Sequence, residues 1–318
     1  MNITQKRYKG IMMIVVGAAL WGISGTVAQQ LFASEGFQPG WLVTVRMMVA
    51  GILLLLWTAA KSGQQEIWQI FRHTEDRVRL FIFAVGGMVG VQYTYFMAVG
   101  TGDAATATLL QYLGPIFITV YVAWKCRRLP NRWEISALVL ALIGAFLLIT
   151  NGSFQGISIP VDAFIWGIVS ALAAAFYTVY PVRLLGRWNS AIVVGWSMVL
   201  GSMCLATFNP LWDVAGQHWT LLSASYVAFV ILFGTLVPFY MFIESLRYIT
   251  STEASVLSSA EPLAAVIVAC LWLHVAFGLW QGVGGLCIIA TVTLLAIKKP
   301  VEDSGEVQSS GEAKSVAL

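Results

Sequence analysis

The sequence contains very few charged residues. Asp, Glu, Lys and Arg make up 10% of its 318 residues, whereas soluble domains carry about 25%. So small a charged fraction cannot solvate an ordinary globular surface, and the dense Lys and Arg that nucleic-acid binding requires are missing as well. Because hydrophobic residues make up 58% of the chain, we predict an all-α polytopic membrane protein that has the lipid bilayer, and no nucleic acid, as its partner.

The sequence also lacks motifs for metal, cofactor or nucleotide chemistry. Its four cysteines form no Cys-x-x-Cys pair, and its three histidines, His73, His218 and His274, fall in different joints between apolar runs. A membrane enzyme needs His, Asp or Glu in a cluster, and an ATP-driven pump needs a Gly-x-x-x-x-Gly-Lys-Ser/Thr loop, which is absent. We therefore expect no metal, no cofactor and no enzymatic activity.

Ten long apolar runs fill most of the chain. A membrane-spanning helix needs about 20 mostly apolar residues, and each run is continuous rather than alternating, so the runs predict helices. Gly and Pro inside them are compatible with lipid, because neighbouring helices satisfy the freed backbone groups. The predicted spans are 10–32, 40–60, 79–99, 103–124, 133–150, 162–183, 190–209, 222–244, 252–273 and 277–297.

Basic residues define the orientation of the predicted spans. All of the 18 Lys and Arg residues except Arg46 fall in or directly beside the N-terminus, alternate joints or the C-terminal tail. The acidic residues Glu35, Asp103, Asp162 and Asp213 fall in joints on the opposite side. Because Lys and Arg are retained on the cytoplasmic side, we predict a multi-pass protein of the cell membrane with both termini in the cytoplasm.

The second half of the chain repeats the first. A shift of 147 residues aligns 92–149 with 239–296 without a gap. The repeat predicts two units of five spans, at 10–150 and 162–297. The remaining segments are a cytoplasmic N-terminus (1–9), an extracytoplasmic linker (151–161) and a disordered cytoplasmic tail (298–318). The aligned pairs include Tyr93 with Tyr240, Ala107 with Ala254, Pro115 with Pro262, and Trp133 with Trp280.

An odd number of spans in each unit has a structural consequence. Two five-helix units in one chain must enter the membrane with opposite orientations, which makes them inverted repeats. Inverted repeats about an axis in the membrane plane are typical of secondary transporters, which alternate access by rocking one half against the other. We therefore expect a transporter of a small-molecule substrate. The alternatives are an integral membrane enzyme and a signalling or structural membrane protein without transport.

The sequence resembles the EamA-type transporters of the drug/metabolite transporter superfamily over residues 10–297. The resemblance implies export of a small metabolite, such as an amino acid or a related compound, and leaves the substrate open. One departure is that relatives often carry Glu before the last helix of each half, where this chain has Arg128 and Val275. The segments that carry the resemblance are Ala19–Gly22, Arg46 in the second span, Leu109–Pro115, and Glu253–Pro262.

Two charged residues fall inside predicted spans. Burying Arg46 or Glu261 in the bilayer costs at least about 2.5 kcal/mol, so each needs a partner or a wet cavity. Glu261 could carry protons between the two sides, bind a substrate ammonium, pair with Arg46, or make only a structural hydrogen bond. Arg46 could instead extend its side chain to the membrane surface.

Polar and aromatic side chains near mid-span are candidates for a substrate cavity. The family resemblance implies a cavity near the midplane between the halves, lined by spans 1, 3, 4, 6, 8 and 9. Pro115 and Pro262 occupy equivalent mid-span positions, where they could act as hinges or serve packing alone. The predicted lining residues are Trp21, Tyr93, Gln111, Tyr112, Tyr177, Tyr240, Ser258 and Glu261.

Cysteine-accessibility labelling checks the topology. We expect a cysteine at position 35 to react from outside the cell, and cysteines at positions 75 and 187 to react from the cytoplasm. The reason is the one-sided distribution of Lys and Arg. A cysteine at position 35 that reacts only from the cytoplasm would contradict both the orientation and the count of ten spans.

Overall fold

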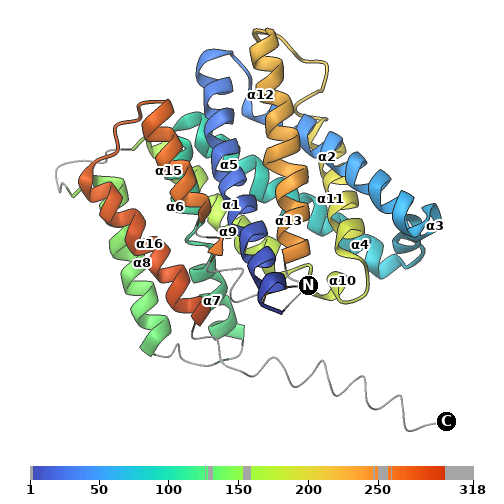
Figure 1. Cartoon of the computed structure of the whole chain (residues 1–318), viewed down its shortest axis with the longest axis horizontal. Helices are drawn as coiled ribbons and strands as arrows, with labels where there is room; N and C mark the ends of the chain where they lie inside the picture. Colours follow the sequence, from blue (N-terminus) through green and yellow to red (C-terminus); the bar gives the residue numbers. More distant parts are fainter. Residues whose placement is uncertain are drawn as a thin grey trace.

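The computed structural model is helical throughout the residues that it describes (Figure 1). These residues are 3–125, 127, 132–152, 159–245, 248–249, 257–258 and 260–297. The tail 298–318, the centre of the linker 151–161, and Arg128 lie outside the described residues, so their predictions remain predictions.

Nine helical segments cover the described part of the first repeat, apart from one short 3₁₀ turn, Ile70–Arg72. Pro39 begins the second helix, a position where proline is favoured because its missing N–H has no intrahelical partner. Asp103 caps the sixth helix by accepting a hydrogen bond from the Thr106 backbone N–H. The segments are α1 (Ile3–Ser34), α2 (Pro39–Ser62), α3 (Gln64–Gln69), α4 (Thr74–Ile82), the π-helix η2 (Phe83–Val89), α5 (Gly90–Thr101), α6 (Ala104–Gln111), α7 (Gly114–Lys125) and α8 (Arg132–Thr150).

The described part of the second repeat follows the same order. Thr220 and Ser223 form a capping box at the start of its third span, in which each side chain accepts a hydrogen bond from the other's backbone N–H. The helices are α9 (Val161–Val179), α10 (Val182–Leu185), α11 (Ser190–Leu205), α12 (Leu221–Ile231), the π-helix η3 (Leu232–Leu236), α13 (Val237–Ser245), α15 (Ala260–Trp272) and α16 (Leu279–Ile297).

These helices account for all ten predicted spans. Six described segments are long and apolar enough to cross a bilayer, and four shorter apolar helices accompany them. The predicted all-α polytopic membrane fold is confirmed. The six long segments are 7–34, 39–62, 74–101, 104–121, 161–185 and 221–242, and the shorter ones are 135–148, 190–205, 260–272 and 279–291.

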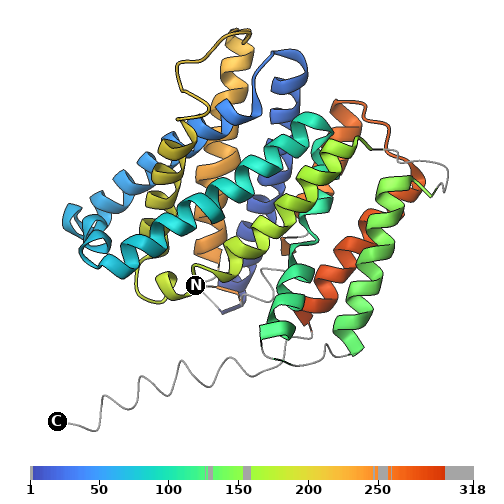
Figure 2. The same ribbon diagram turned by 180° about the vertical axis from the view of Figure 1, so that it is seen from behind.

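The helix pairs repeat under an exchange of the two halves. The second span packs on the seventh as α2 on α11, and the fifth packs on the tenth as α8 on α16. The third span packs on the sixth as α5 on α9, and the exchanged pair, eighth on first, appears as α13 on α1. Figures 1 and 2 show the α8–α16 pair on one flank of the molecule and the α2–α11 pair on the other. This pairing is that of two inverted five-helix repeats.

The repeat extends to a rare backbone feature. The third span contains the π-helix η2, and the eighth span contains η3. A shift of 147 residues moves Phe83–Val89 onto 230–236, which overlaps η3. π-Helical turns are uncommon and concentrate at functional sites. The two π-helices occupy equivalent positions, so the same local widening of the helix backbone recurs in both repeats.

Hydrogen bonds join the two repeats at the end that carries the N-terminus. Asp76 is buried and accepts a bond from the Arg187 guanidinium at 3.1 Å and another from the Trp188 indole N–H at 3.1 Å. Beside it, Glu75 forms a 3.1 Å ion pair with Arg183. Because Asp76 precedes the third span and Arg187 precedes the seventh, these bonds hold the two halves together at this end.

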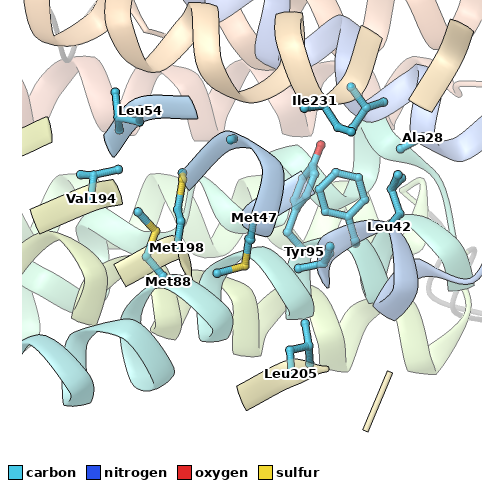
Figure 3. Packing of buried hydrophobic residues seen from close by; sticks show 14 of the residues in the cluster. Ala28, Leu42, Met47, Leu54, Met88, Tyr95, Val194, Met198, Leu205 and Ile231 are labelled. Carbon is cyan, nitrogen blue, oxygen red and sulfur yellow. The ribbon is translucent and has the colours of Figure 1, made fainter. Parts of the chain in front are cut away.

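The largest apolar core lies between α2, α5, α11 and α12. Leu42, Met47, Met88 and Met198 are almost fully buried within it. Figure 3 shows these side chains, from α2, η2 and α11, packed together, with the hydroxyl of Tyr95 directed toward Ile231 at one edge. The core therefore contains residues of both repeats and has a polar group at its boundary.

A glycine substitution tests the α8–α16 contact. A Cβ at Gly284 would lie 2.6 Å from the Gly144 carbonyl oxygen, whereas a Cβ at Gly282, on the same helix, would meet nothing within 4 Å. We expect Gly284→Ala to lower the free energy of unfolding by about 1–3 kcal/mol, because the helices would have to separate. Gly282→Ala is the matched control and should leave stability unchanged or raise it, because Ala favours helix. Thermal unfolding in detergent measures both, and equal midpoints would contradict the close contact.

Candidate functional site

The fourth span is interrupted near its middle. Helix α6 ends at Gln111, α7 begins at Gly114, and Tyr112 and Leu113 form the turn between them. The Leu113 N–H bonds to the Leu110 carbonyl at 3.1 Å, a tighter pattern than that of an α-helix. Pro115 explains the interruption, because a proline has no N–H to donate and its ring clashes with the carbonyl four residues earlier.

In the ninth span, the described helix α15 includes the equivalent proline. Helix α15 starts at Ala260, with Pro262 in its first turn, and the Glu261 N–H bonds to the Ser258 carbonyl at 2.9 Å. The shift of 147 residues maps Tyr112 and Leu113 onto 259 and 260. The two predicted hinge prolines thus occupy the first turns of α7 and α15.

The two helix starts face each other across the boundary between the repeats. The hydroxyl of Tyr112 donates a hydrogen bond to the Ser258 carbonyl at 2.6 Å and lies 3.3 Å from Oε2 of Glu261. A helix N-terminus carries a partial positive charge that favours a carboxylate nearby. The first turn of α15 therefore holds Glu261 in a stabilising position next to a hydroxyl of the other repeat.

Further polar side chains continue this cluster into the first repeat. The Tyr95 hydroxyl and Thr108 Oγ1 are 2.9 Å apart and buried. Tyr95 also interacts electrostatically with both Glu261 and Arg46. Gln111 donates from Nε2 to Ser170 Oγ at 2.6 Å, which links the end of α6 to α9. We call Tyr95, Thr108, Tyr112, Ser258 and Glu261 the polar cluster.

Arg46 lies on the far side of Tyr95 from Glu261. Its side chain is 6% exposed, and its guanidinium carbon lies 4.6 Å from the centre of the Phe96 ring. Within the described residues, its buried Nε has no hydrogen-bond partner and no ion pair joins it to Glu261. A cation–π contact offsets only part of the cost of burying this charge. Arg46 therefore leaves a buried positive group that an anion or water would stabilise.

Helix α1 closes the other side of the cluster. A Cβ at Gly22 would overlap the Glu261 carbonyl oxygen, so only glycine permits this approach of α1 to α15. The adjacent Trp21 packs edge-on against Phe239 at 5.3 Å and lies 5.7 Å from Phe242 on α13. The Trp21–Gly22 pair thus places α1 between the polar cluster and the eighth span.

The structure brings together half of the predicted cavity residues. Tyr112, Ser258 and Glu261 meet at the starts of α7 and α15, and Gln111 lies beside them at the end of α6, whereas the other four pack against aromatic neighbours. Ser170 and Thr108 were not predicted; both are small polar residues in apolar spans, which is the only signal that could have identified them. The four dispersed residues are Trp21 beside Phe239, Tyr93 beside Trp166 at 6.0 Å, Tyr177 stacked on Phe83 at 5.5 Å, and Tyr240 beside Trp57 at 5.4 Å.

A cavity of about 450 Å³ opens elsewhere, between α2, α13 and the start of α11. It lies in spans 2, 7 and 8, toward the end of the molecule that carries the N-terminus. Of the predicted cavity residues, only Tyr240 lines it. A midplane cavity lined by spans 1, 3, 4, 6, 8 and 9 remains a prediction.

Inverted five-helix repeats with an interrupted span at their boundary are typical of secondary transporters. The EamA-like transporter family matches the chain twice, at residues 8–150 and 162–297. The chain therefore belongs to the EamA-like transporter family and is a multi-pass membrane transporter. The family is one of transporters, so the prediction that the chain is not an enzyme is confirmed.

Individual relatives agree with this assignment. An uncharacterized inner membrane transporter of Salmonella typhimurium, YicL, is 34% identical over 291 residues, 91% of this chain and 95% of that protein. The uncharacterized transporter YwfM of Bacillus subtilis is 26% identical and covers 80% of this chain. A crystal structure with a TM-score of 0.60 and 14% identity covers 92% of this chain and 97% of its own, and this likeness concerns the fold alone.

Removal of the Tyr112 hydroxyl tests the bond between the two helix starts. We expect Tyr112→Phe to lower the free energy of unfolding by about 1–2 kcal/mol, because the Ser258 carbonyl loses a buried donor. Tyr177→Phe is the matched control, since Tyr177 packs against Phe83 through its ring. Denaturation in detergent compares the two variants, and equal losses would show that the Tyr112 bond contributes nothing specific.

Proposed function

We propose that this protein is a secondary transporter that exports a small metabolite, such as an amino acid or a related compound, by alternating access. The observation that carries the proposal is the hydrogen-bonded contact around Glu261 between the interrupted fourth span of one repeat and the start of α15 in the other. Interrupted helices at a repeat interface supply helix ends and free carbonyls for substrate and ions. The outward direction is supported by the family resemblance.

The polar cluster would open and close as the halves rock. The units at 10–150 and 162–297 move as two bodies, and the Tyr112 contacts to Ser258 and Glu261 form in the closed arrangement. When the units separate, the Glu261 carboxylate and the Ser258 carbonyl become free to bind substrate or a proton. Pro115 and Pro262 act as hinges, because each lies in the first turn of a described helix, where proline leaves one helix hydrogen bond unmade.

Glu261 has two functional roles that the geometry supports. It could receive a proton from one side and release it to the other, with the Tyr112 hydroxyl as its hydrogen-bond partner. It could also remain ionised and bind the ammonium group of a substrate. The first role makes transport depend on a proton gradient, and the second makes it depend on substrate charge.

The proposed location is the inner membrane, with both termini in the cytoplasm. The location is supported by the description of the Salmonella relative as an inner membrane transporter. The orientation is supported by the distribution of Lys and Arg over alternate joints.

Glu261→Gln tests the proposal, because it keeps the shape of the side chain and removes its charge and titration. In inside-out vesicles supplied with a metabolite panel, we expect the wild-type protein to accumulate its substrate. We expect the variant to lose at least tenfold in rate. A proton role predicts that the response to an imposed pH gradient disappears, whereas an ammonium-binding role predicts weaker substrate affinity at every pH. Glu66→Gln, in the peripheral helix α3, is the control.

Normal transport by Glu261→Gln, with unchanged pH dependence, would contradict both roles. Glu261 would then be only a structural hydrogen-bond acceptor for Tyr112.

A further inference from the structure

Within the described residues, three buried polar side-chain atoms have no hydrogen-bond partner. They are Ser24 Oγ on α1, Arg46 Nε on α2 and Gln92 Oε1 on α5, in side chains that are 2%, 6% and 8% exposed. Buried polar groups are nearly always hydrogen-bonded, so each exception points to a water or an ion. All three belong to the first repeat, in which α5 packs on both α1 and α2. One small region of this repeat therefore holds polar groups that need a further partner.

The three side chains lie at a similar depth in the bundle. Arg46 follows the start of α2 by seven residues, Gln92 precedes the end of α5 by nine, and Ser24 precedes the end of α1 by ten. Successive spans run in opposite directions, so these helix ends lie together, opposite the N-terminus (Figure 1). At the rise of an α-helix, all three residues are about 10–15 Å below that end. The π-helix η3 packs on both α1 and α2, and π-helical turns concentrate at functional sites.

Arg46 carries the one full charge among these groups. Its guanidinium carbon lies 4.6 Å from the centre of the Phe96 ring, a contact that offers no oxygen or nitrogen acceptor to the guanidinium N–H donors. No ion pair joins Arg46 to a carboxylate in the part of the chain that the structure describes. An uncompensated buried charge is strongly destabilising. A water would satisfy the N–H groups but would not neutralise the charge.

The two acidic residues that interact electrostatically with Tyr95, beside Arg46, already have other partners. Asp103 caps α6, where its carboxylate accepts from a backbone N–H at 2.8 Å and from a hydroxyl at 2.7 Å. Glu261 lies 3.3 Å from a tyrosine hydroxyl in the polar cluster. Because neither carboxylate pairs with Arg46, an anion from outside the chain would supply the missing counter-charge.

Ser24 and Gln92 add neutral donors to this charge. A Cβ at Gly234 would overlap Ser24 Oγ, so the hydroxyl faces η3 with no side chain of Gly234 in the way. Gln92 Nε2 has only the Met88 thioether at 3.8 Å, which is a weak acceptor. An amide can turn either its oxygen or its NH₂ group toward a ligand, because the two have nearly the same shape. A guanidinium, a hydroxyl and an amide from three helices form the set of donors that a small anion requires.

We propose that Arg46, Ser24 and Gln92 bind a small monovalent inorganic anion of the size of chloride. The guanidinium supplies the counter-charge, and the Ser24 hydroxyl and the Gln92 amide donate to the same anion. Because so little of any of the three side chains is exposed, the site suits an ion and not a larger organic anion. The site lies within the first repeat, away from the contact of Tyr112 with Ser258, and does not depend on the proposed function.

Chloride titration of the purified full-length protein tests the proposal. Thermal unfolding is followed in detergent while chloride replaces gluconate, a bulky anion, at constant ionic strength. A ligand that binds only the folded state raises the unfolding midpoint as its concentration rises. We expect this rise in wild type and its loss in Arg46→Gln. Arg72→Gln is the control, because it removes an exposed positive charge elsewhere, and it should keep the rise.

Chlorine NMR measures binding directly, since exchange with a bound site broadens the chloride line and bromide reverses the broadening by competition. We expect Arg46→Lys, which keeps the charge, to retain chloride binding with a lower affinity, because an ammonium lacks the guanidinium fork. Ser24→Ala should weaken chloride affinity about tenfold, because it removes a donor to an anion. Ser197→Ala is the matched control, since the buried Ser197 hydroxyl bonds to the Val193 carbonyl of its own helix at 2.6 Å. It should leave chloride affinity unchanged.

The proposal is overturned if chloride changes neither the unfolding midpoint nor the line width of wild type, or if Arg46→Gln responds to chloride as wild type does. The three buried groups would then be satisfied by water alone. Equal chloride affinities of Ser24→Ala and Ser197→Ala would overturn the assignment of Ser24 to the site. Glu261→Gln should bind chloride as wild type does, so a loss of transport in that variant bears on the proposed function alone.

Discussion

A backbone carbonyl inside a bilayer has no water to bond to, and this constraint governs where the helices of this protein can be interrupted. The turn after α6, at Tyr112 and Leu113, takes backbone groups out of regular helix bonding. It lies at the boundary between the repeats, where the Tyr112 hydroxyl donates to the Ser258 carbonyl at 2.6 Å. The turn is therefore covered by the other repeat instead of facing lipid.

The two inverted repeats resemble each other more closely in their backbone features than in their polar side chains. The π-helices, the prolines in the first turns of α7 and α15, and the helix pairs all recur after exchange of the halves. The side chains do not recur, since the position of Glu261 in the second repeat is occupied by Gly114 in the first. Gly114 instead packs closely on the backbone of α9. A symmetric backbone scaffold thus carries this acidic group in one repeat only.

The two charged residues inside the predicted spans are each stabilised by neighbouring groups of the protein. Glu261 is held by a hydroxyl and a helix N-terminus, whereas Arg46 is held mainly by the Phe96 ring. Tyr95 interacts electrostatically with both of these charges. At the N-terminal end, Asp76 and Arg187 join the repeats by a direct ion pair. The two repeats are therefore joined both at this end and at the polar cluster.

Several features were determined by the sequence alone. The apolar runs predicted ten helices because a bilayer demands about 20 apolar residues per span, and the gapless shift of 147 residues predicted the inverted repeats. The intramembrane charges Arg46 and Glu261 were identifiable because they are costly in lipid. Composition and spacing act locally along the chain, so they report these features without any knowledge of packing.

Only the tertiary structure decided which polar residues meet. Tyr112 and Ser258 are 146 residues apart, and their contact depends on how α6 and α15 cross, which no local pattern specifies. Tyr93, Tyr177 and Tyr240 looked equivalent to Tyr112 in the sequence, yet each packs against a different aromatic partner because helix rotation directs it elsewhere. The cavity beside Lys61 and Glu244 was invisible for the same reason, since residues of three separate helices create its volume. The sequence shows which side chains of each helix are suited to burial. The angles between the packed helices determine which of these buried groups become neighbours.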